Sequence, residues 1–228
     1  MSDYANGRTL NIYKPENWTS FDVVAKLRNI LRIKKIGHAG TLDPFATGVL
    51  VVCTGKATKQ INTFVDTKKE YVGTVEFGKT TDSFDVTGKI TSESSTEELT
   101  LEKIQEILPE FRGEILQTPP MFSAKKIKGK RLYKLARKGI EVERPPVQIT
   151  IFELEILEAN LPFVTFKVVC SKGTYIRALA DDIGKRLGCG AYLQKLVRTK
   201  VGDFRVEDSI TIESLIEQVK DENSKESV

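Results

Sequence analysis

The segment that most constrains the fold is residues 37–48, where three glycines and an Asp-Pro pair stand directly before a continuous apolar run. Glycine permits backbone dihedrals that other residues avoid, and Pro44 fixes its own φ while pushing Asp43 toward an extended conformation. Residues 49–53 are all apolar and predict a buried strand. The pattern predicts a rigid loop that presents one carboxylate, although a tight turn in which Asp43 bonds only its own backbone has the same composition.

Strands and helices are predicted to follow one another irregularly along the rest of the chain. Hydrophobic spacing predicts further strands at residues 10–13, 71–77, 148–157 and 163–170, and helices at residues 20–31, 101–108 and 176–187. Ser20 is the expected N-cap of the first helix. Because there is no regular βαβ rhythm, we predict an α+β fold with a central mixed or antiparallel sheet flanked by helices.

The composition is that of an ordinary globular protein, with 228 residues, a hydrophobic fraction of 40% and a charged fraction of 29%. No apolar run approaches the roughly 18 residues of a membrane span, and the polar start is no signal peptide, so a cytoplasmic protein is the expectation. The three cysteines are odd in number and widely spaced, which favours buried thiols over a disulfide frame or a zinc site. With His38 as the only histidine, a His-rich metal site is excluded.

Basic residues cluster in two stretches that contain no acid. The net charge of +4 is in itself a weak argument for nucleic acid. The first stretch carries Lys125, Lys126, Lys128, Lys130, Arg131, Lys134, Arg137 and Lys138, and the second carries Lys26, Arg28, Arg32, Lys34 and Lys35. Segregated positive charge is what a polyanion-binding face requires, since each neutralised phosphate releases counterions. Solvated helix faces are the alternative interpretation.

Two distant residues could cooperate with Asp43. Arg177 follows a predicted strand-to-helix junction at residues 171–174 and falls in the first helical turn, where backbone N–H groups gather anions. An arginine there can pair with a carboxylate and keep it ionised, although an exposed surface arginine would fit the same pattern. Tyr71 stands at the start of a predicted strand, where ordinary strand core is the alternative.

Residues 37–50, GHAGTLDPFATGVL, resemble the catalytic motif of the TruB family of tRNA pseudouridine synthases. Other segments resemble further motifs of the family in the same order: residues 14–15 with 18–20, 69–71, 81–85, 119–124 with the basic stretch after them, 172–177 and 193–199. The likeness runs from about residue 10 to about residue 206. It implies the pseudouridine-synthase fold, with a basic RNA-gripping insertion, and an isomerase that needs neither a cofactor nor a metal.

Matched residue by residue, the resemblance implies an active site that acts on uridine 55 in the T-loop of tRNA. Asp43 matches the catalytic aspartate. Tyr71 matches a tyrosine that stacks on the target uracil, and Leu196 a leucine that lines the same pocket. Arg177 matches an arginine that pairs with the catalytic carboxylate, and Asp85 a second carboxylate of that charge network.

Three more residues are expected to support this site. His38 matches a histidine that helps hold the RNA loop open, and Lys14 and Pro15 match residues that support the active-site wall. The family's first motif usually has glycine where this chain has Asn17. Asparagine tolerates the left-handed conformation better than most residues, so the turn is expected to survive.

The expected organisation is one catalytic domain, residues 1–206, followed by a short acidic helix and tail at residues 207–228. Many members of the family carry a C-terminal RNA-binding PUA domain, for which that tail is too short. The RNA grip is therefore expected in the basic segment, at about residues 119–146, as a flap that orders on RNA. Its expected contacts to the RNA backbone are Lys125, Lys126, Lys128, Lys130 and Arg131. The expected partner is the tRNA T-arm, with no obligate protein partner and a monomer as the default.

Two alternative functions remain open at this stage. One is a guide-RNA-dependent relative acting on ribosomal RNA, against which the absence of a PUA domain and residues 45–47 argue. The other is a tRNA-binding or folding factor that merely retains the fold. The substitution Asp43→Asn tests this last possibility, because a protein that only binds tRNA should keep its full function without the carboxylate.

Overall fold

The computed structural model describes residues 2–127 and 129–225 and divides into two compact units. The first unit comprises Met1–Tyr71 with Leu196–Val228, and the second comprises Val72–Lys195. The chain passes from one unit to the other within two strands, β4 (Lys69–Phe77) and β12 (Ala191–Val201).

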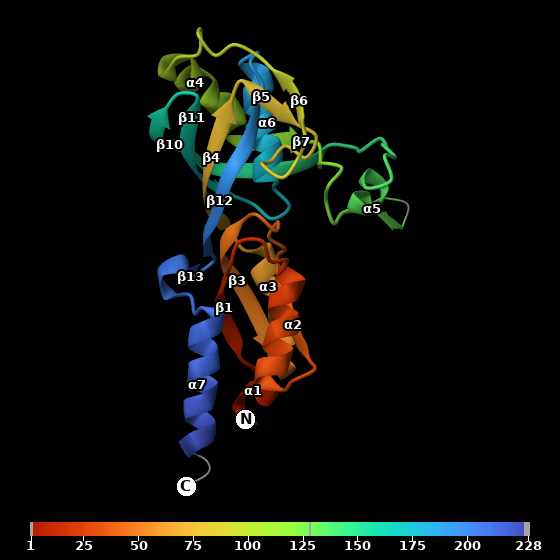
Figure 1. Cartoon of the computed structure of the whole chain (residues 1–228), viewed down its shortest axis with the longest axis vertical. Coiled ribbons are helices and arrows are strands. Elements are labelled where there is room, and N and C mark those ends of the chain that lie inside the picture. Colours follow the sequence, from red (N-terminus) through yellow and green to blue (C-terminus); the bar gives the residue numbers. More distant parts are fainter. Residues whose placement is uncertain (1, 128, 226–228) are drawn as a thin grey trace. The chain divides into compact units, whose positions relative to one another are not determined.

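Over the described residues, nine strands form one mixed sheet with the hydrogen-bonded order β1-β3-β12-β4-β11-β10-β7 (Figure 1). Besides β4 and β12, the ordered strands are β1 (Thr9–Lys14), β3 (Thr47–Thr54), β7 (Gly113–Gln117), β10 (Val147–Asn160) and β11 (Phe163–Cys170). Two short strands pair off this path, β2 (Ile36–Ala39) with β3 and β13 (Phe204–Arg205) with β12. Strand β12 is parallel to β3, whereas β1 and β2 are antiparallel to it. The predicted α+β fold with a mixed sheet is confirmed.

In the first unit, strand β3 is buried on both faces. Leu50 and Val52 face the helices α2 (Ser20–Leu31) and α7 (Ile212–Lys225), which pack together on one side of the sheet (Figure 1). Val49 and Val51 face the opposite side, where α3 (Ile61–Asp66) contributes to the cover. A strand with apolar neighbours on both faces needs a continuous apolar run rather than alternation, which explains the sequence of β3.

The N-cap of helix α2 lies one residue earlier than the sequence predicted. Thr19, not Ser20, is the N-cap, and it forms a capping box in which Asp22 accepts a hydrogen bond from the Thr19 backbone N–H. An acid three residues after the cap completes this motif, and only Thr19 has one at that spacing. The Ser20 hydroxyl is instead buried and bonds Leu42.

In the second unit, α6 (Ile176–Arg186) packs on the sheet. Four of its apolar residues, Ile176, Leu179, Ala180 and Ile183, line one apolar pocket with residues of β4, β10, β11 and β12. The predicted alternation of Tyr71, Val75 and Phe77 along β4 is confirmed by their burial.

Shorter elements complete the two units. They are α1 (Ser2–Gly7), β5 (Lys79–Thr81), β6 (Ile90–Glu93), α4 (Leu101–Ile107), β8 (Lys126–Ile127), β9 (Lys130–Arg131) and α5 (Leu132–Ala136), with 3-10 turns at Gly55–Gln60, Leu108–Phe111 and Val206–Asp208. Cys53, Cys170 and Cys189 are buried thiols, as predicted. No helix in the described ranges has both the length and the apolar character needed to span a membrane.

Asn17 adopts the left-handed conformation that the sequence predicted, with a φ of 63°. Its backbone N–H donates to the Pro44 carbonyl at 2.8 Å, so this turn also fixes the residue that follows Asp43. We expect Asn17→Ala to lower the free energy of unfolding by about 1 kcal/mol, because alanine pays the full steric cost of this region.

Asn17→Gly is the matched control and should stay within about 0.5 kcal/mol of the wild type, because glycine enters this conformation freely. Urea unfolding measures both changes. Equal destabilisation by alanine and glycine would show that the side-chain amide, and not the backbone conformation, is what matters here.

Candidate active site

Residues 40–46, here called the Asp43 loop, leave β2 and return into β3, and their backbone is pinned on both sides of Asp43. The Leu42 N–H donates to the Ser20 hydroxyl at 2.9 Å. The Pro44 carbonyl accepts from the Asn17 N–H at 2.8 Å, and the Ala46 N–H donates to the Asp43 carbonyl at 3.1 Å. Asp43 itself is half-buried. A loop with this many fixed points presents its carboxylate from a rigid base.

Lys14 is a buried cation beneath this loop. Its ammonium donates to the carbonyls of Pro15 at 2.8 Å, Trp18 at 2.6 Å and Pro44 at 3.1 Å, which uses all three of its protons. Burial lowers the pKa of Lys14 to about 8, partly opposed by the negative charge of Asp43. Lys14 therefore ties the end of β1 to Pro44, the residue after Asp43.

His38, in β2, lies just before the Asp43 loop and carries a lowered pKa. Burial is the main cause, and the positive charge of Arg198 adds to it, while a hydrogen bond with the Gly40 backbone opposes it. Its Nδ1 atom is buried and has no hydrogen-bond partner among the described residues. The environment therefore favours the neutral imidazole, with one ring nitrogen unused by the protein.

Tyr71 lies in the part of β4 that belongs to the first unit, and Leu196 lies in the corresponding part of β12. Both side chains are largely buried, with exposed fractions of 8% for Tyr71 and 7% for Leu196. The first unit thus holds six of the predicted site residues: Lys14, Pro15, His38, Asp43, Tyr71 and Leu196.

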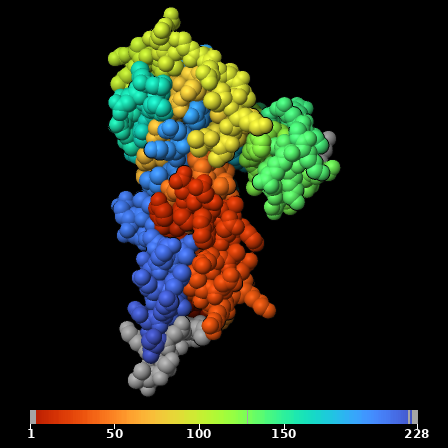
Figure 2. All heavy atoms as spheres, in the orientation of Figure 1, coloured from red at the N-terminus to blue at the C-terminus, as the bar shows by residue number. Residues whose placement is uncertain are grey.

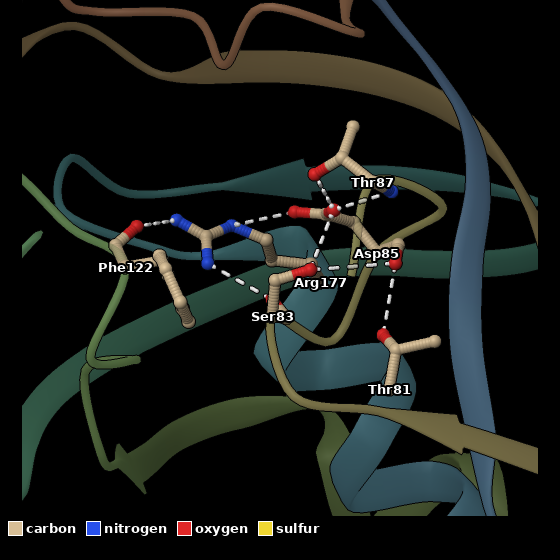
Figure 3. Close-up of polar contacts among 6 residues, drawn as sticks. All are labelled: Thr81, Ser83, Asp85, Thr87, Phe122 and Arg177. Carbon is tan, nitrogen blue, oxygen red and sulfur yellow. Dashed lines mark hydrogen bonds and ion pairs between the residues drawn. The ribbon is translucent and has the colours of Figure 1, made fainter. Parts of the chain in front are cut away.

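The second unit holds the other two, and it brings them together. Arg177, in the first turn of α6, lies with its Nε 3.7 Å from Oδ2 of Asp85 (Figure 3). Both side chains are buried, Arg177 to 2% exposure, which rules out the exposed surface arginine that the sequence pattern left open.

Neighbouring hydroxyls orient the Asp85 carboxylate. Its Oδ1 accepts from the Ser83 hydroxyl at 2.8 Å, the Thr87 hydroxyl at 2.5 Å and the Thr87 N–H at 3.0 Å (Figure 3). These three hydrogen bonds all go to Oδ1, whereas Oδ2 is the oxygen that faces Arg177. The pair is thus a buried ion pair whose remaining acceptor sites are satisfied, the arrangement that such pairs require.

The remaining nitrogens of Arg177 bind backbone. Nη1 donates to the Ser83 carbonyl at 3.1 Å, and Nη2 donates to the Phe122 carbonyl at 2.5 Å (Figure 3). Phe122 lies in the Pro-Pro-containing stretch at residues 119–124, directly before the basic segment. One guanidinium therefore joins the turn that carries Asp85 to the root of that segment.

The basic segment lies within the second unit. Lys126, Lys130 and Arg131 belong to the short hairpin of β8 and β9 and are exposed, and Lys125 before them is half-buried (green in Figure 2). Lys128, the fifth expected RNA contact, lies outside the described residues. Leu132, fully buried, anchors the start of α5.

Sequence reasoning missed several residues that shape the site. Arg198 supports the Asp43 loop, Ser20 bonds it, and Ser83 and Thr87 hold Asp85. A usable signal existed for Arg198, since it stands two residues after Leu196 in a strand and must share its face. The hydroxyl residues around Asp85 had no signal beyond turn composition. Within residues 2–127 and 129–225, no three His, Cys, Asp or Glu side chains are grouped to hold a metal ion.

We predict that His38 makes the stability of the protein fall as the pH drops. Its folded-state pKa is lowered, whereas in the unfolded chain it is near 6.5, so below that pH the unfolded state binds a proton that the folded state does not. The free energy of unfolding of the wild type should therefore decrease from pH 7.5 to pH 5.5 by more than that of His38→Gln, as measured by urea unfolding.

The comparison with His38→Gln isolates the imidazole, because the chain has no other histidine. Asp182, whose pKa burial raises to about 6, also titrates in this range but does so in both proteins. Identical pH dependence of the two proteins would mean that His38 is not held neutral by its surroundings.

Comparison with protein families gives two matches that together cover most of the chain. The model of the TruB family pseudouridylate synthase (N terminal domain) matches residues 28–176. The model of the tRNA pseudouridylate synthase B C-terminal domain matches residues 177–228.

Curated relatives are similar over nearly the whole length. A tRNA pseudouridine synthase B of Phocaeicola vulgatus is 50% identical over 98% of this chain and 98% of its own length. A protein of the same name from Clostridium tetani is 52% identical over 92% of this chain and 72% of its own.

Among solved structures, a chain of the Cbf5-Nop10-Gar1 complex is 33% identical with a TM-score of 0.74. That match covers 95% of this chain, which spans about 55% of the length of that one. The family matches, the curated relatives and this structural likeness agree with the motifs found in order along the sequence. The chain belongs to the TruB family of pseudouridylate synthases.

Proposed function

We propose that this protein isomerises uridine 55 in the T-loop of tRNA to pseudouridine, with Asp43 as its catalytic carboxylate. The observation that carries the proposal is the Asp43 loop, whose backbone is fixed on both sides of the one carboxylate that it presents. Curated relatives that are about half identical over nearly the whole chain are named tRNA pseudouridine synthase B, which supports tRNA as the substrate.

The reaction breaks the glycosidic bond between C1′ of the ribose and N1 of uracil, turns the base, and forms a bond between C1′ and C5. The proton on C5 is released, and N1 takes up a proton, so no electrons are gained or lost. An ionised carboxylate suits this chemistry, whether it attacks a carbon atom or abstracts a proton. A rigid loop lowers the barrier by holding that carboxylate where the reacting atoms will be.

Tyr71 and Leu196 would receive the base. Taking a uridine out of its stack costs a few kcal/mol, and an aromatic platform returns roughly 1–3 kcal/mol per base. Tyr71 supplies the aromatic ring and Leu196 an apolar wall. His38, whose side chain is half-buried, would contact the RNA loop. Lys14 and Pro15 support the site through the hydrogen bonds of Lys14 to the backbone.

Arg177 and Asp85 would act as one charged unit. The two are paired within the second unit, and Asp85 also accepts hydrogen bonds from the hydroxyls of Ser83 and Thr87. The resemblance assigns Arg177 as the partner of the catalytic carboxylate. That pairing with Asp43 stays a prediction.

The exposed cations of residues 125–131 would bind the RNA backbone, with the T-arm as the expected partner. Among the described residues of that segment, Lys126, Lys130 and Arg131 project to the surface. The proposal includes a monomer that needs no protein partner and works in the cytoplasm, and it places the RNA grip in this flap.

The two alternative functions are weaker. The curated relatives at about 50% identity are named for tRNA, which supports a tRNA substrate over guide-dependent modification of ribosomal RNA. A pure folding factor would not need an anchored carboxylate together with the buried Arg177–Asp85 pair.

Tritium release from an unmodified tRNA transcript that carries 5-³H-uridine tests the chemistry. We expect the wild type to release tritium and Asp43→Asn to release none above background, a loss of at least about 10³-fold, because the amide can neither attack nor take a proton. Asp66→Asn, which changes an acid at the end of α3, is the matched control and should keep full activity.

Absence of tritium release by the wild type would exclude an enzyme acting on this substrate. Equal release by the wild type and Asp43→Asn would keep an enzyme but remove Asp43 from its centre.

The salt dependence of tRNA binding tests the basic segment. Replacing Lys126, Lys130 and Arg131 with alanine should weaken binding and reduce the slope of log K against log salt by about 2–3, because each lost phosphate contact contributes about 0.7–0.9. Filter binding at several salt concentrations gives the slope.

Lys103→Ala is the control, since Lys103 lies in α4 and pairs with Glu98. Its slope should equal that of the wild type. An unchanged slope in the triple variant would place the RNA on another surface.

A further inference from the structure

We propose that Arg198, which has no assigned role in substrate binding or catalysis, is a positioning residue that locks both ends of the Asp43 loop. The inference rests on the proposed function, because its effect on the reaction would come through the placement of Asp43.

The geometry places one guanidinium across the two ends of the loop. Arg198 Nη2 donates to the Gly40 carbonyl at 3.1 Å, where the chain has just left β2. Arg198 Nε donates to the Val49 carbonyl at 2.7 Å, where the chain has entered β3. These partners lie 158 and 149 residues away in sequence, so the contact is purely tertiary. The side chain is 1% exposed.

The backbone of β12 brings Arg198 to this place. Arg198 pairs in parallel register with Gly48, the second residue of β3. A Cβ on Gly48 would lie 2.3 Å from the Arg198 carbonyl oxygen, and the φ of Gly48 is +102°. Only glycine permits this approach, which is why a glycine closes the motif.

An arginine is suited to this task and a lysine is not. Its planar fork donates in two fixed directions at once, whereas an ammonium is a single point charge on a flexible stem. Burying a guanidinium is costly unless its N–H donors form hydrogen bonds. Here two of them donate to the carbonyls of Gly40 and Val49, one on each side of Asp43. A structural role alone would need only one such bond to the sheet, at Val49.

The charge of Arg198 also reaches the neighbours of Asp43. The positive charge of Arg198 lowers the pKa of Lys14 and the pKa of His38. The side chains of Arg198, Lys14 and His38 therefore lie in one region of the first unit. Asp43 is the foremost negative charge acting on Lys14. The backbone of the loop is therefore held by two buried cations, Lys14 and Arg198.

Steady-state kinetics on the tRNA transcript test the positioning role. Arg198→Met keeps the apolar stem and removes the fork, and we expect kcat to fall by about 100-fold with KM for tRNA within about threefold of the wild type. Arg198→Lys restores the charge and one of the bonds, and should recover kcat to within about 10-fold. Lys200→Met, the same change two residues along β12, should behave as the wild type. Thermal unfolding sets an assay temperature at which every variant is folded.

An NMR titration of the imidazole gives a readout that does not depend on activity. His38 is the only histidine, so its signals need no further assignment. Arg198→Met should raise the pKa of His38, Arg198→Lys should leave it nearly unchanged, and Lys200→Met should leave it unchanged.

A folded Arg198→Met protein with the kcat of the wild type would overturn the positioning role. An unmoved His38 pKa in that variant would overturn the placement of the guanidinium. If the wild type were inactive on tRNA while the His38 pKa still rose in Arg198→Met, the proposed reaction would fail and the anchoring geometry would stand. The two failures are therefore distinguishable.

Discussion

The candidate site depends on buried cations that satisfy the carbonyls of a loop. Lys14 donates to the carbonyls of Pro15, Trp18 and Pro44, and Arg198 donates to those of Gly40 and Val49. A loop between two strands cannot satisfy these groups through the sheet, and buried carbonyls without donors are costly. Lysine and arginine have donors and no acceptors, so each can serve several carbonyls at once. Lys14 and Arg198 therefore have two effects: their hydrogen bonds fix the backbone of the Asp43 loop, and their positive charges lie in the region of Asp43.

In the second unit, the buried Asp85 carboxylate is stabilised by hydrogen bonds and by an ion pair with Arg177. Asp85 receives three donors on one oxygen and turns the other toward Arg177. Removing a donor there would leave a buried carboxylate short of hydrogen bonds, which costs more than the bond itself gains. Because Arg177 also donates to the Phe122 carbonyl, the start of the basic segment and the Asp85 turn are held by the same side chain. An arginine serves here for the reason it serves at position 198, since its fork can bind three groups in fixed directions.

Much of this could be predicted from the sequence, and the failures have physical causes. The apolar run of β3 and the alternation in β4 follow from residue type and spacing, and the left-handed Asn17 follows from the family resemblance, whose first motif usually has glycine there. The structure has all three. The N-cap was wrong by one residue because Thr19 and Ser20 are equally good caps in isolation, and only Asp22 and the contact of Ser20 with Leu42 separate them. The burial of Arg177 could not be predicted from the pattern, and for Arg198 the sequence indicated only that it shares a strand face with Leu196. A basic residue in a helix or strand looks the same in sequence whether it faces solvent or a distant carbonyl. Tertiary contacts decide such cases.

The central claim is that this chain changes one uridine of tRNA by means of Asp43. Carbodiimide labelling and primer extension on a mixed, unmodified tRNA transcript pool test it most directly, because the method reports both the reaction and its position. After incubation with the wild type, a stop should appear at the site of uridine 55 and nowhere else, and after incubation with Asp43→Asn no stop should appear, although the variant still binds tRNA. Stops at other uridines, or an Asp43→Asn protein that gives the same stop as the wild type, would contradict the account.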